Sequence, residues 1–286
     1  VSPCVMEPHH FFTAQRVLIV AGKGGVGKSA VSAALALTSA RAGLRTLLVS
    51  LDAESIEVPQ HELLERVTVT PGRALTDYLA SKGMGLLSRQ LAKSGIVELV
   101  ATTAPGLDDL LVLGRIKAFE QELRADVIIV DGPAAGHALD LVQAPIQLKR
   151  AISSGPIGSQ ADEVLNMLSD ANRCKLLLVT TAAFTPVMET VEALAQIHTT
   201  VNMSLASIVV NKCDEDVPAL HTALESPLAD AYNYALQRHA AQQEAITQLS
   251  SAITAEQIHI ARHRVAGALL VEEIAADIAA QIGGAA

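Results

Sequence analysis

Short runs of apolar residues recur along the chain, and stretches of helical character lie between them. The runs that we predict as strands are Arg16–Ala21, Arg45–Ser50, Asp126–Asp131, Lys175–Thr180 and Ser207–Asn211. Apolar and polar positions do not alternate within these runs, as they do in strands that have one solvent-facing side. Continuous apolar runs are typical of strands that are buried on both faces of a parallel sheet.

The segments between the strands carry signals for helices. Ser29–Gly43 is rich in alanine and ends on glycine, and Pro186–Ile197 begins on proline, which is favoured in a first helical turn. Ala268–Ile282 is predicted as the last helix. Strands that alternate with helices predict an α/β fold with a doubly wound, mainly parallel sheet. In such a fold, ligands bind at the carboxyl ends of the strands.

The chain has 286 residues, of which 50% are hydrophobic, and this is enough to bury a sizeable core. Aromatic residues make up only 2%, so the core must be built mainly from Val, Leu, Ile and Ala. We predict a single domain over residues 1–286, with core strands from about residue 16. Two less regular regions, about 56–125 and 219–255, are predicted as mainly helical insertions.

Charge and cysteine content exclude several classes of protein. The formal net charge of −9 disfavours nucleic-acid partners, because an acidic chain repels phosphate backbones. No apolar run reaches about 18 residues, so we expect no transmembrane segment. Cys4, Cys174 and Cys213 are isolated and form no C-x-x-C pair, which favours a reducing, cytoplasmic location.

The segment Gly22–Ser29, with the sequence GKGGVGKS, matches the phosphate-binding pattern G-x-x-x-x-G-K-[ST]. It follows a predicted strand and opens a predicted helix, which is the context that this motif requires. Glycines allow backbone N–H groups to approach phosphate oxygens closely, and a helix N-terminus adds free N–H groups and partial positive charge. The segment is therefore predicted to bind the phosphates of a nucleotide.

Individual residues of this segment have distinct expected roles. Lys28 is expected to reach the β- and γ-phosphates, and the Ser29 hydroxyl is expected to coordinate Mg²⁺. The residues predicted to contact the nucleotide here are Gly22, Lys23, Gly24, Gly25, Val26, Gly27, Lys28, Ser29 and Ala30.

Two carboxylates follow predicted strands. Asp131 ends the run DVIIVD before a Gly-Pro break, and an aspartate buried there without a cation would be costly. We expect Asp131 to hold Mg²⁺ through its hydration shell. Asp52 lies at the end of the second strand, and we expect it to contact the metal or to orient the water that attacks the γ-phosphate. Capping of the strand end is the alternative role for Asp52.

Lys23 directly follows the first glycine, so the loop reads K-G-G-x-G-K-[ST]. This pattern resembles the deviant Walker A loop of the ParA, MinD and nitrogenase iron-protein ATPases. In that class, the extra lysine reaches across a dimer interface to the nucleotide of the partner. The resemblance implies that Lys23 is a catalytic counter-charge to the phosphates of a second subunit.

The chain also resembles the ArsA-type ATPases, the family of the arsenite-pump ATPases and of the ATPase that delivers tail-anchored membrane proteins. The motifs that carry the resemblance are KGGVGKS, SLDAES at the place of switch I, DGPAAGHALDLVQAP at the place of switch II, TTAPGLDDLL, and the strand end VVN at 209–211. The resemblance implies that Asp52 polarises the attacking water and that Asn211 contacts adenine. It also implies that hydrolysis moves the loops Asp52–Ser55 and Gly132–His137.

The partners that the resemblance implies are a second subunit and a cargo. The dimer would contain two copies of the chain or one copy and a paralogous subunit, and the cargo would be an unknown protein or membrane partner. Ala53 and Glu54 stand where the family has proline and histidine, and Asp140 replaces a switch II arginine. Cysteines for a zinc-linked dimer or for arsenite, a soft ligand, are missing. The resemblance is therefore closest to small bacterial ArsA-like ATPases.

Two other functions fit parts of the sequence. Asn211-Lys212-Cys213-Asp214 matches N-K-x-D, the guanine-reading motif of GTPases, in which the aspartate accepts the N1 and N2 hydrogens of guanine. The altered switch I region also fits a nucleotide-switched binding module with little turnover.

Overall fold

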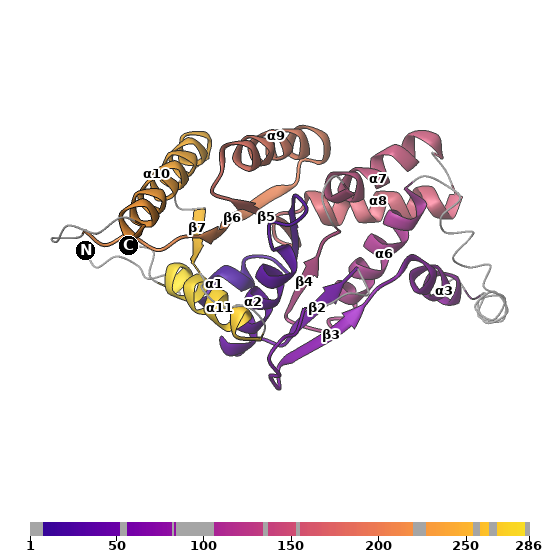
Figure 1. Ribbon diagram of the computed structural model, residues 1–286. Helices are drawn as coiled ribbons and strands as arrows, with labels where there is room; N and C mark the ends of the chain where they lie inside the picture. The colour runs from indigo at the N-terminus through magenta and orange to yellow at the C-terminus, as the bar shows by residue number, and fades with distance from the viewer. Residues whose placement is uncertain are drawn as a thin grey trace, which may run out of the picture.

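The computed structural model describes residues 8–51, 56–81, 83, 106–133, 137–152, 155–219, 227–253, 258–262 and 268–283. Within these ranges, seven strands form one sheet in the order β3-β2-β4-β1-β5-β6-β7 (Figure 1), and every neighbouring pair is parallel. The strands are β1 (Val17–Gly22), β2 (Thr46–Ser50), β3 (Leu64–Thr68), β4 (Val127–Asp131), β5 (Cys174–Thr181), β6 (Ser204–Cys213) and β7 (Ile258–Arg262). The predicted α/β fold with a doubly wound parallel sheet is confirmed.

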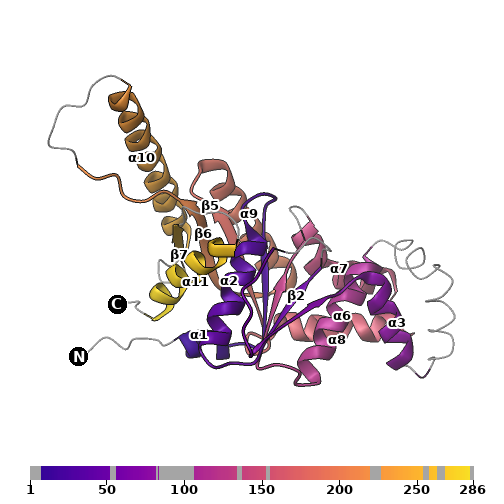
Figure 2. The ribbon, with the colours of Figure 1, turned by 60° about the horizontal axis from the view of Figure 1, so that its bottom comes forward.

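Helices cover both faces of this sheet (Figure 1, Figure 2). One face carries α1 (Pro8–Thr13), α2 (Lys28–Arg41) and α11 (Ala268–Gly283), which contact one another. The other face carries α3 (Pro71–Ser81), α6 (Leu107–Gln121), α7 (His137–Ala151), α8 (Gly155–Ser169), α9 (Phe184–Val201) and α10 (Leu228–Ala252). The sheet is therefore the middle of three layers.

The central strands divide their side chains between two apolar cores. In β1, Val17, Ile19 and Ala21 pack into the core under α6 to α9. Leu18 and Val20 point to the opposite side and pack into the core under α2 and α11. All five residues are at most 2% exposed, because strand side chains alternate between faces and both faces are covered. This double burial explains the unbroken apolar runs of the sequence.

Strand β3 is a difference from the sequence-based expectation. The region 56–125 is expected from its sequence to be mainly helical, and it does contain α3 and α6, but β3 pairs with β2 as an edge strand of the sheet. Its sequence is LERVT, and Glu65 and Arg66 are exposed. An edge strand with charged, solvent-facing residues has no continuous apolar run, so its pattern gives no strand signal.

The region 219–255 contains the long helix α10. Figure 2 shows that α10 extends beyond the rest of the molecule. Its contact with the body is narrow, since the buried residues of the helix are Gln242, Ala245 and Leu249. Among the described helices, none combines the length and the apolar character needed to cross a membrane.

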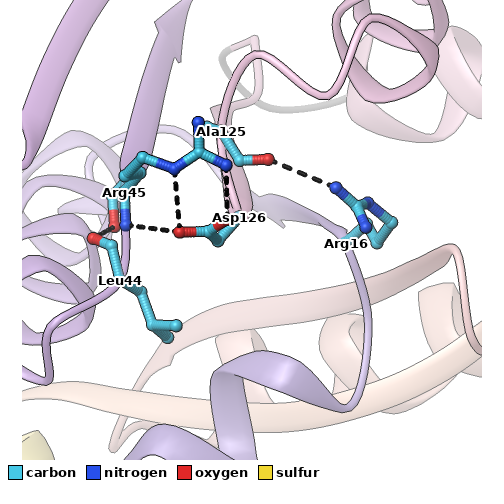
Figure 3. Close-up of polar contacts among 6 residues, drawn as sticks. Arg16, Leu44, Arg45, Ala125 and Asp126 are labelled. Carbon is cyan, nitrogen blue, oxygen red and sulfur yellow. Dashed lines mark hydrogen bonds and ion pairs between the residues drawn. The ribbon is translucent and has the colours of Figure 1, made fainter.

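An ion pair joins β2 and β4 where both strands begin (Figure 3). Asp126 accepts hydrogen bonds from the guanidinium of Arg45, with Nη2 at 2.7 Å and Nε at 3.2 Å, and from the Arg45 backbone N–H at 2.9 Å. Arg16, just before β1, donates from its guanidinium to the carbonyl oxygen of Ala125 at 3.4 Å. These contacts hold three central strands in register at the edge opposite the predicted site.

Candidate nucleotide-binding site

Parallel pairing brings the predicted site residues to one edge of the sheet. Asp131, the last residue of β4, lies opposite Val20 of β1 and Ser50 of β2. Asn211 of β6 lies opposite Thr181, the last residue of β5. The loop between β1 and α2 begins at the same carboxyl edge, which is where doubly wound sheets bind their ligands.

Gly22 and Gly27 fix the path of this loop. A Cβ atom at Gly22 would lie 2.2 Å from the carbonyl oxygen of Val179, so the neighbouring strand β5 leaves no room for a side chain. Gly27 has a φ of 91°, which glycine adopts without steric cost, and a Cβ atom there would lie 2.3 Å from Nδ2 of Asn211. Both positions therefore require the glycine that the motif supplies.

Lys28 begins α2 and folds back over the loop. Its Nζ donates a hydrogen bond to the carbonyl oxygen of Lys23 at 3.4 Å, and the residue is only 7% exposed. Gly24 and Gly25, which lie between the two lysines, are exposed. The Lys28 cation and the N–H groups of the first turn of α2 are the groups that this loop can offer to an anion.

Oxygen atoms that suit Mg²⁺ lie next to the loop. Ser29 is half-buried at the second position of α2, and Asp131 is half-buried at the end of β4. The Ser32 hydroxyl, which is fully buried, donates a hydrogen bond to Oδ1 of Asp131 at 3.0 Å and so orients the carboxylate. Mg²⁺ prefers hydroxyl and carboxylate oxygens and combines one or two of them with phosphate and water, so this donor set fits the ion.

Within the described ranges, histidines and other metal-binding side chains do not gather into a second metal site. Groups of three or more His, Cys, Asp or Glu side chains that could hold a metal do not occur in the part of the chain that the structure describes. His259, the first of two histidines four positions apart, lies in strand β7, is 7% exposed and stacks edge-on against Phe11. Burial lowers its pKa, so the imidazole is neutral and part of the core.

Strand β6 supports the loop from the other side. The buried side chain of Asn211 donates from Nδ2 to the carbonyl oxygen of Val26 at 2.8 Å. The next residue, Lys212, has a φ of 60° and donates from Nζ to the carbonyl oxygen of Gly25 at 2.7 Å. These two hydrogen bonds hold the carbonyl groups of Gly25 and Val26 against β6.

Lys23 contacts a residue of its own chain. Its Nζ forms an ion pair with Oε1 of Glu189 on α9, and the two side chains are 53% and 39% exposed. The second carboxylate oxygen of Glu189 is buried and accepts no hydrogen bond from the residues that the structure describes. The lysine that is expected to reach a second subunit is thus held within the chain by a partly exposed pair.

Asp214, the last residue of the N-K-x-D match, turns toward α10. Its Oδ2 lies 2.7 Å from Nε of Arg238, and its backbone N–H donates to Oε1 of Gln242 at 2.9 Å. Arg238 and Gln242 are four residues apart, so they lie on the same face of the helix.

The structure therefore brings Lys23, Lys28, Ser29, Asp131 and Asn211 together at one edge of the sheet. Asp52, Ala53 and Glu54 of the predicted switch I lie outside the described residues, as do Ala134–Gly136 of the predicted switch II. Asp140 is exposed in the first turn of α7.

Four residues that touch this site are not predicted from the sequence: Ser32, Glu189, Arg238 and Gln242. Ser32 follows Lys28 by four residues on α2, and this helical spacing is a signal that could have identified it. The other three reach the loop or the end of β6 from α9 and α10, so only the tertiary structure places them there.

A glycine-rich loop that leaves the first strand of a parallel, doubly wound sheet and opens a helix defines a P-loop nucleotide-binding protein. The chain belongs to the family of the CobQ/CobB/MinD/ParA nucleotide binding domain, whose model matches residues 17–235.

Curated relatives confirm the resemblance to ArsA-type ATPases. ATPase BagA of Mycobacterium tuberculosis is 31% identical over 229 residues, which cover 71% of this chain and 66% of the relative. A putative arsenical pump-driving ATPase of Halobacterium salinarum is 26% identical over 228 residues, with 68% and 35% covered. ATPase GET3 of Podospora anserina is 29% identical over 173 residues, with 55% and 51% covered. The chain thus spans at most 66% of the length of these relatives.

Proposed function

We propose that this chain hydrolyses ATP with the help of Mg²⁺ and that it does so as a dimer assembled around bound nucleotide. The observation that carries the proposal is the loop Gly22–Ser29, in which exposed glycines, the buried Lys28 and the start of α2 meet next to Asp131. The names of the relatives, which are ATPases, support the same activity.

In this mechanism Lys28 and Asp52 act on the triphosphate. Nζ of Lys28 leaves the carbonyl oxygen of Lys23 and binds the β- and γ-phosphates. Asp52 orients a water molecule for in-line attack on the γ-phosphorus, and the bond from that phosphorus to the bridging oxygen breaks to give ADP and phosphate. Asp52 follows Ser50 by two residues, and Ser50 lies opposite Asp131, so chain connectivity favours this role.

Ser29 would hold Mg²⁺ directly, and Asp131 would hold it through water, with Asp52 as a further oxygen donor. The ion would neutralise charge on the phosphates. The hydrogen bond from Ser32 keeps the Asp131 carboxylate in one orientation for this purpose.

Lys23 acts in the dimer. We infer that it exchanges its pair with Glu189 for the phosphates of the nucleotide in the second subunit, which is a copy of this chain or a paralogous one. A cation that meets the developing negative charge only in the assembled dimer couples hydrolysis to assembly.

Hydrolysis would then be transmitted to a partner. We infer that loss of the γ-phosphate releases the loops Asp52–Ser55 and Gly132–His137, and that a protein or membrane partner responds to their movement.

Asn211 would contact the adenine base from β6.

Cys174 and Cys213 are buried free thiols, and burial raises the pKa of both, that of Cys213 to about 11, so they stay protonated and unreactive. The isolated cysteines of the sequence are the reason why we place the protein in the reducing cytoplasm.

Measurement of phosphate release by purified variants tests the proposal. Asp52→Asn is expected to lower the rate of ATP hydrolysis by at least about 100-fold while the variant still binds ATP, because the water loses its orienting group. Lys28→Ala is expected to lose both binding and turnover.

The matched control is Asp230→Asn, a charge removal at an exposed position of α10, which should hydrolyse ATP like the unaltered chain. Single-turnover measurements separate an enzyme from a nucleotide-switched binding module. A chain that binds ATP but turns it over no faster than Asp52→Asn contradicts the proposed hydrolysis and favours the module.

A further inference from the structure

The N-K-x-D match in β6 is only partly arranged as a guanine reader. Its first two members, Asn211 and Lys212, support the loop through the carbonyl oxygens of Val26 and Gly25 at 2.8 Å and 2.7 Å. Its last member, Asp214, instead directs its carboxylate to α10, where Nε of Arg238 lies 2.7 Å from Oδ2. The first part of the motif therefore lies against the loop, while the carboxylate that would read guanine is paired with Arg238.

Helix α10 holds Asp214 at two points. Arg238 binds the side chain, and the buried Gln242, one helical turn further on, accepts the backbone N–H of Asp214 at 2.9 Å. Gln242 thereby fixes the backbone that carries the carboxylate, and Arg238 fixes its direction. The Asp214 and Arg238 side chains are 35% and 50% exposed, so a ligand can compete for this pair.

Guanine and adenine differ in what they require from such a carboxylate. Guanine carries hydrogens on N1 and N2, and both need an acceptor when the base is bound. Adenine has no hydrogen on N1 and only a C–H at position 2, so it cannot donate a hydrogen bond to the carboxylate from these positions. If the carboxylate stays paired with a guanidinium, guanine binds with its N1 and N2 hydrogens unpaired, which lowers its affinity. The affinity for adenine does not change, so the pair discriminates between the two bases.

We propose that Arg238 is a specificity-determining residue, which makes the site select adenine over guanine nucleotides by keeping the Asp214 carboxylate paired with α10. This inference rests on the proposed ATP site. It predicts that a guanine nucleotide binds better once the guanidinium is removed, and that the gain depends on Asp214.

The test compares the affinities of fluorescent mant-ATP and mant-GTP for purified chains of residues 1–286. Arg238→Ala is expected to raise the affinity for mant-GTP by roughly three- to tenfold, since a partly exposed ion pair competes only modestly with a ligand. The affinity for mant-ATP should stay within about twofold. Arg238→Ala combined with Asp214→Ala should bring mant-GTP affinity back to that of the unaltered chain.

Two further variants serve as controls. Arg238→Gln removes the guanidinium and its charge but keeps a longer, polar side chain than alanine, and it should show the same gain if the alanine variant is poorly folded. Arg41→Ala removes a similarly exposed arginine, 47% exposed and paired with Glu272 far from the loop, and should change neither affinity.

Each outcome bears on a different claim. An unchanged mant-GTP affinity in both Arg238 variants, with normal mant-ATP binding, overturns the role of Arg238 and leaves the proposed ATPase standing. A gain that persists without Asp214 overturns it as well, because the carboxylate is then not the reader. An unaltered chain that binds neither nucleotide overturns both this inference and the proposed function.

Discussion

Lys23 and Glu189 form a surface ion pair that the proposed mechanism must break. The proposed mechanism needs Lys23 at the nucleotide of a second subunit, whereas the single chain pairs it with Glu189 on α9. Dimer assembly therefore competes with this ion pair. Because both side chains are partly exposed, the competition is expected to be worth no more than about 1 kcal/mol.

Glu189→Gln should make assembly easier. Removal of the negative charge frees Lys23, so the ATP concentration at half-maximal dimerisation should fall by up to about fivefold, which corresponds to about 1 kcal/mol. Mass photometry across an ATP series, in the Asp52→Asn background to prevent turnover, measures this midpoint. Glu192→Gln, an exposed position on the same helix, is the control and should leave it unchanged. A midpoint that is the same with and without Glu189 would show that the pair does not restrain Lys23.

At the scale of single residues, the sequence predicts those site residues that lie in a motif or at the end of a buried strand. Lys28, Ser29 and the glycines are recognisable because a strand, a loop motif and a helix follow one another in the chain. Asp131 is recognisable because a carboxylate ends a buried strand. Glu189 and Arg238 carry no such signal, since they approach the loop and β6 from helices distant in sequence.

At the scale of elements, the order of the central strands keeps the site residues together. Strands β2, β4 and β1 are tied just before their first residues by the contacts of Arg45, Asp126 and Arg16 (Figure 3). The opposite ends of these strands carry Ser50, Asp131 and the loop. A shift of register at one end would displace residues at the other by the same step. The ion pair therefore supports the site from the far edge of the sheet.

Asp126→Asn tests this tie through its pH dependence. The hydrogen bond from Arg45 holds the pKa of Asp126 below its usual value of about 3.9. A depressed pKa stabilises the folded chain above about pH 4, and this stabilisation is lost as the pH falls through the folded-state pKa. Urea denaturation should give a free energy of unfolding that is lower than that of the unaltered chain by up to about 1 kcal/mol at pH 7, with the difference shrinking below about pH 4.

Arg45→Ala provides the control for this prediction. In that background Asp126→Asn should have a clearly smaller effect, because the side-chain partner is already absent and the double-mutant cycle isolates the pair. If Asp126→Asn lowers the free energy of unfolding of the otherwise unaltered chain equally at about pH 7 and about pH 3.5, the account is contradicted, because the effect then does not depend on the charge of the carboxylate.

The central strands and α2, α9 and α11 are predictable because their residues are buried in a regular pattern. Predicted and observed bounds differ by only a few residues, as for Arg45–Ser50 against β2 at Thr46–Ser50. Edge strand β3 is not predicted from the sequence, because its charged side chains face solvent and break the apolar pattern. It is a strand because it pairs with β2.

At the scale of the whole molecule, the predicted features meet at the carboxyl edge of the sheet. The loop, Asp131, Asn211 and the start of α9 all lie there, so two copies that join through this edge would enclose the nucleotide. Each copy carries a formal net charge of −9, which opposes association. Bound ATP adds further negative charge, so in the proposed dimer local attraction between its phosphates and Lys23 and Lys28 would have to outweigh the repulsion, and this makes assembly conditional on ATP.

The most direct measurement is a crystal structure of the Asp52→Asn chain grown with Mg²⁺ and ATP. The account predicts a triphosphate bound by the N–H groups of Gly24–Lys28, with Nζ of Lys28 moved from the carbonyl oxygen of Lys23 to the phosphates and Lys23 directed at a second subunit. A loop without nucleotide, Lys28 still bonded to that carbonyl oxygen, or Lys23 still paired with Glu189 beside a bound triphosphate in an assembled dimer would contradict it.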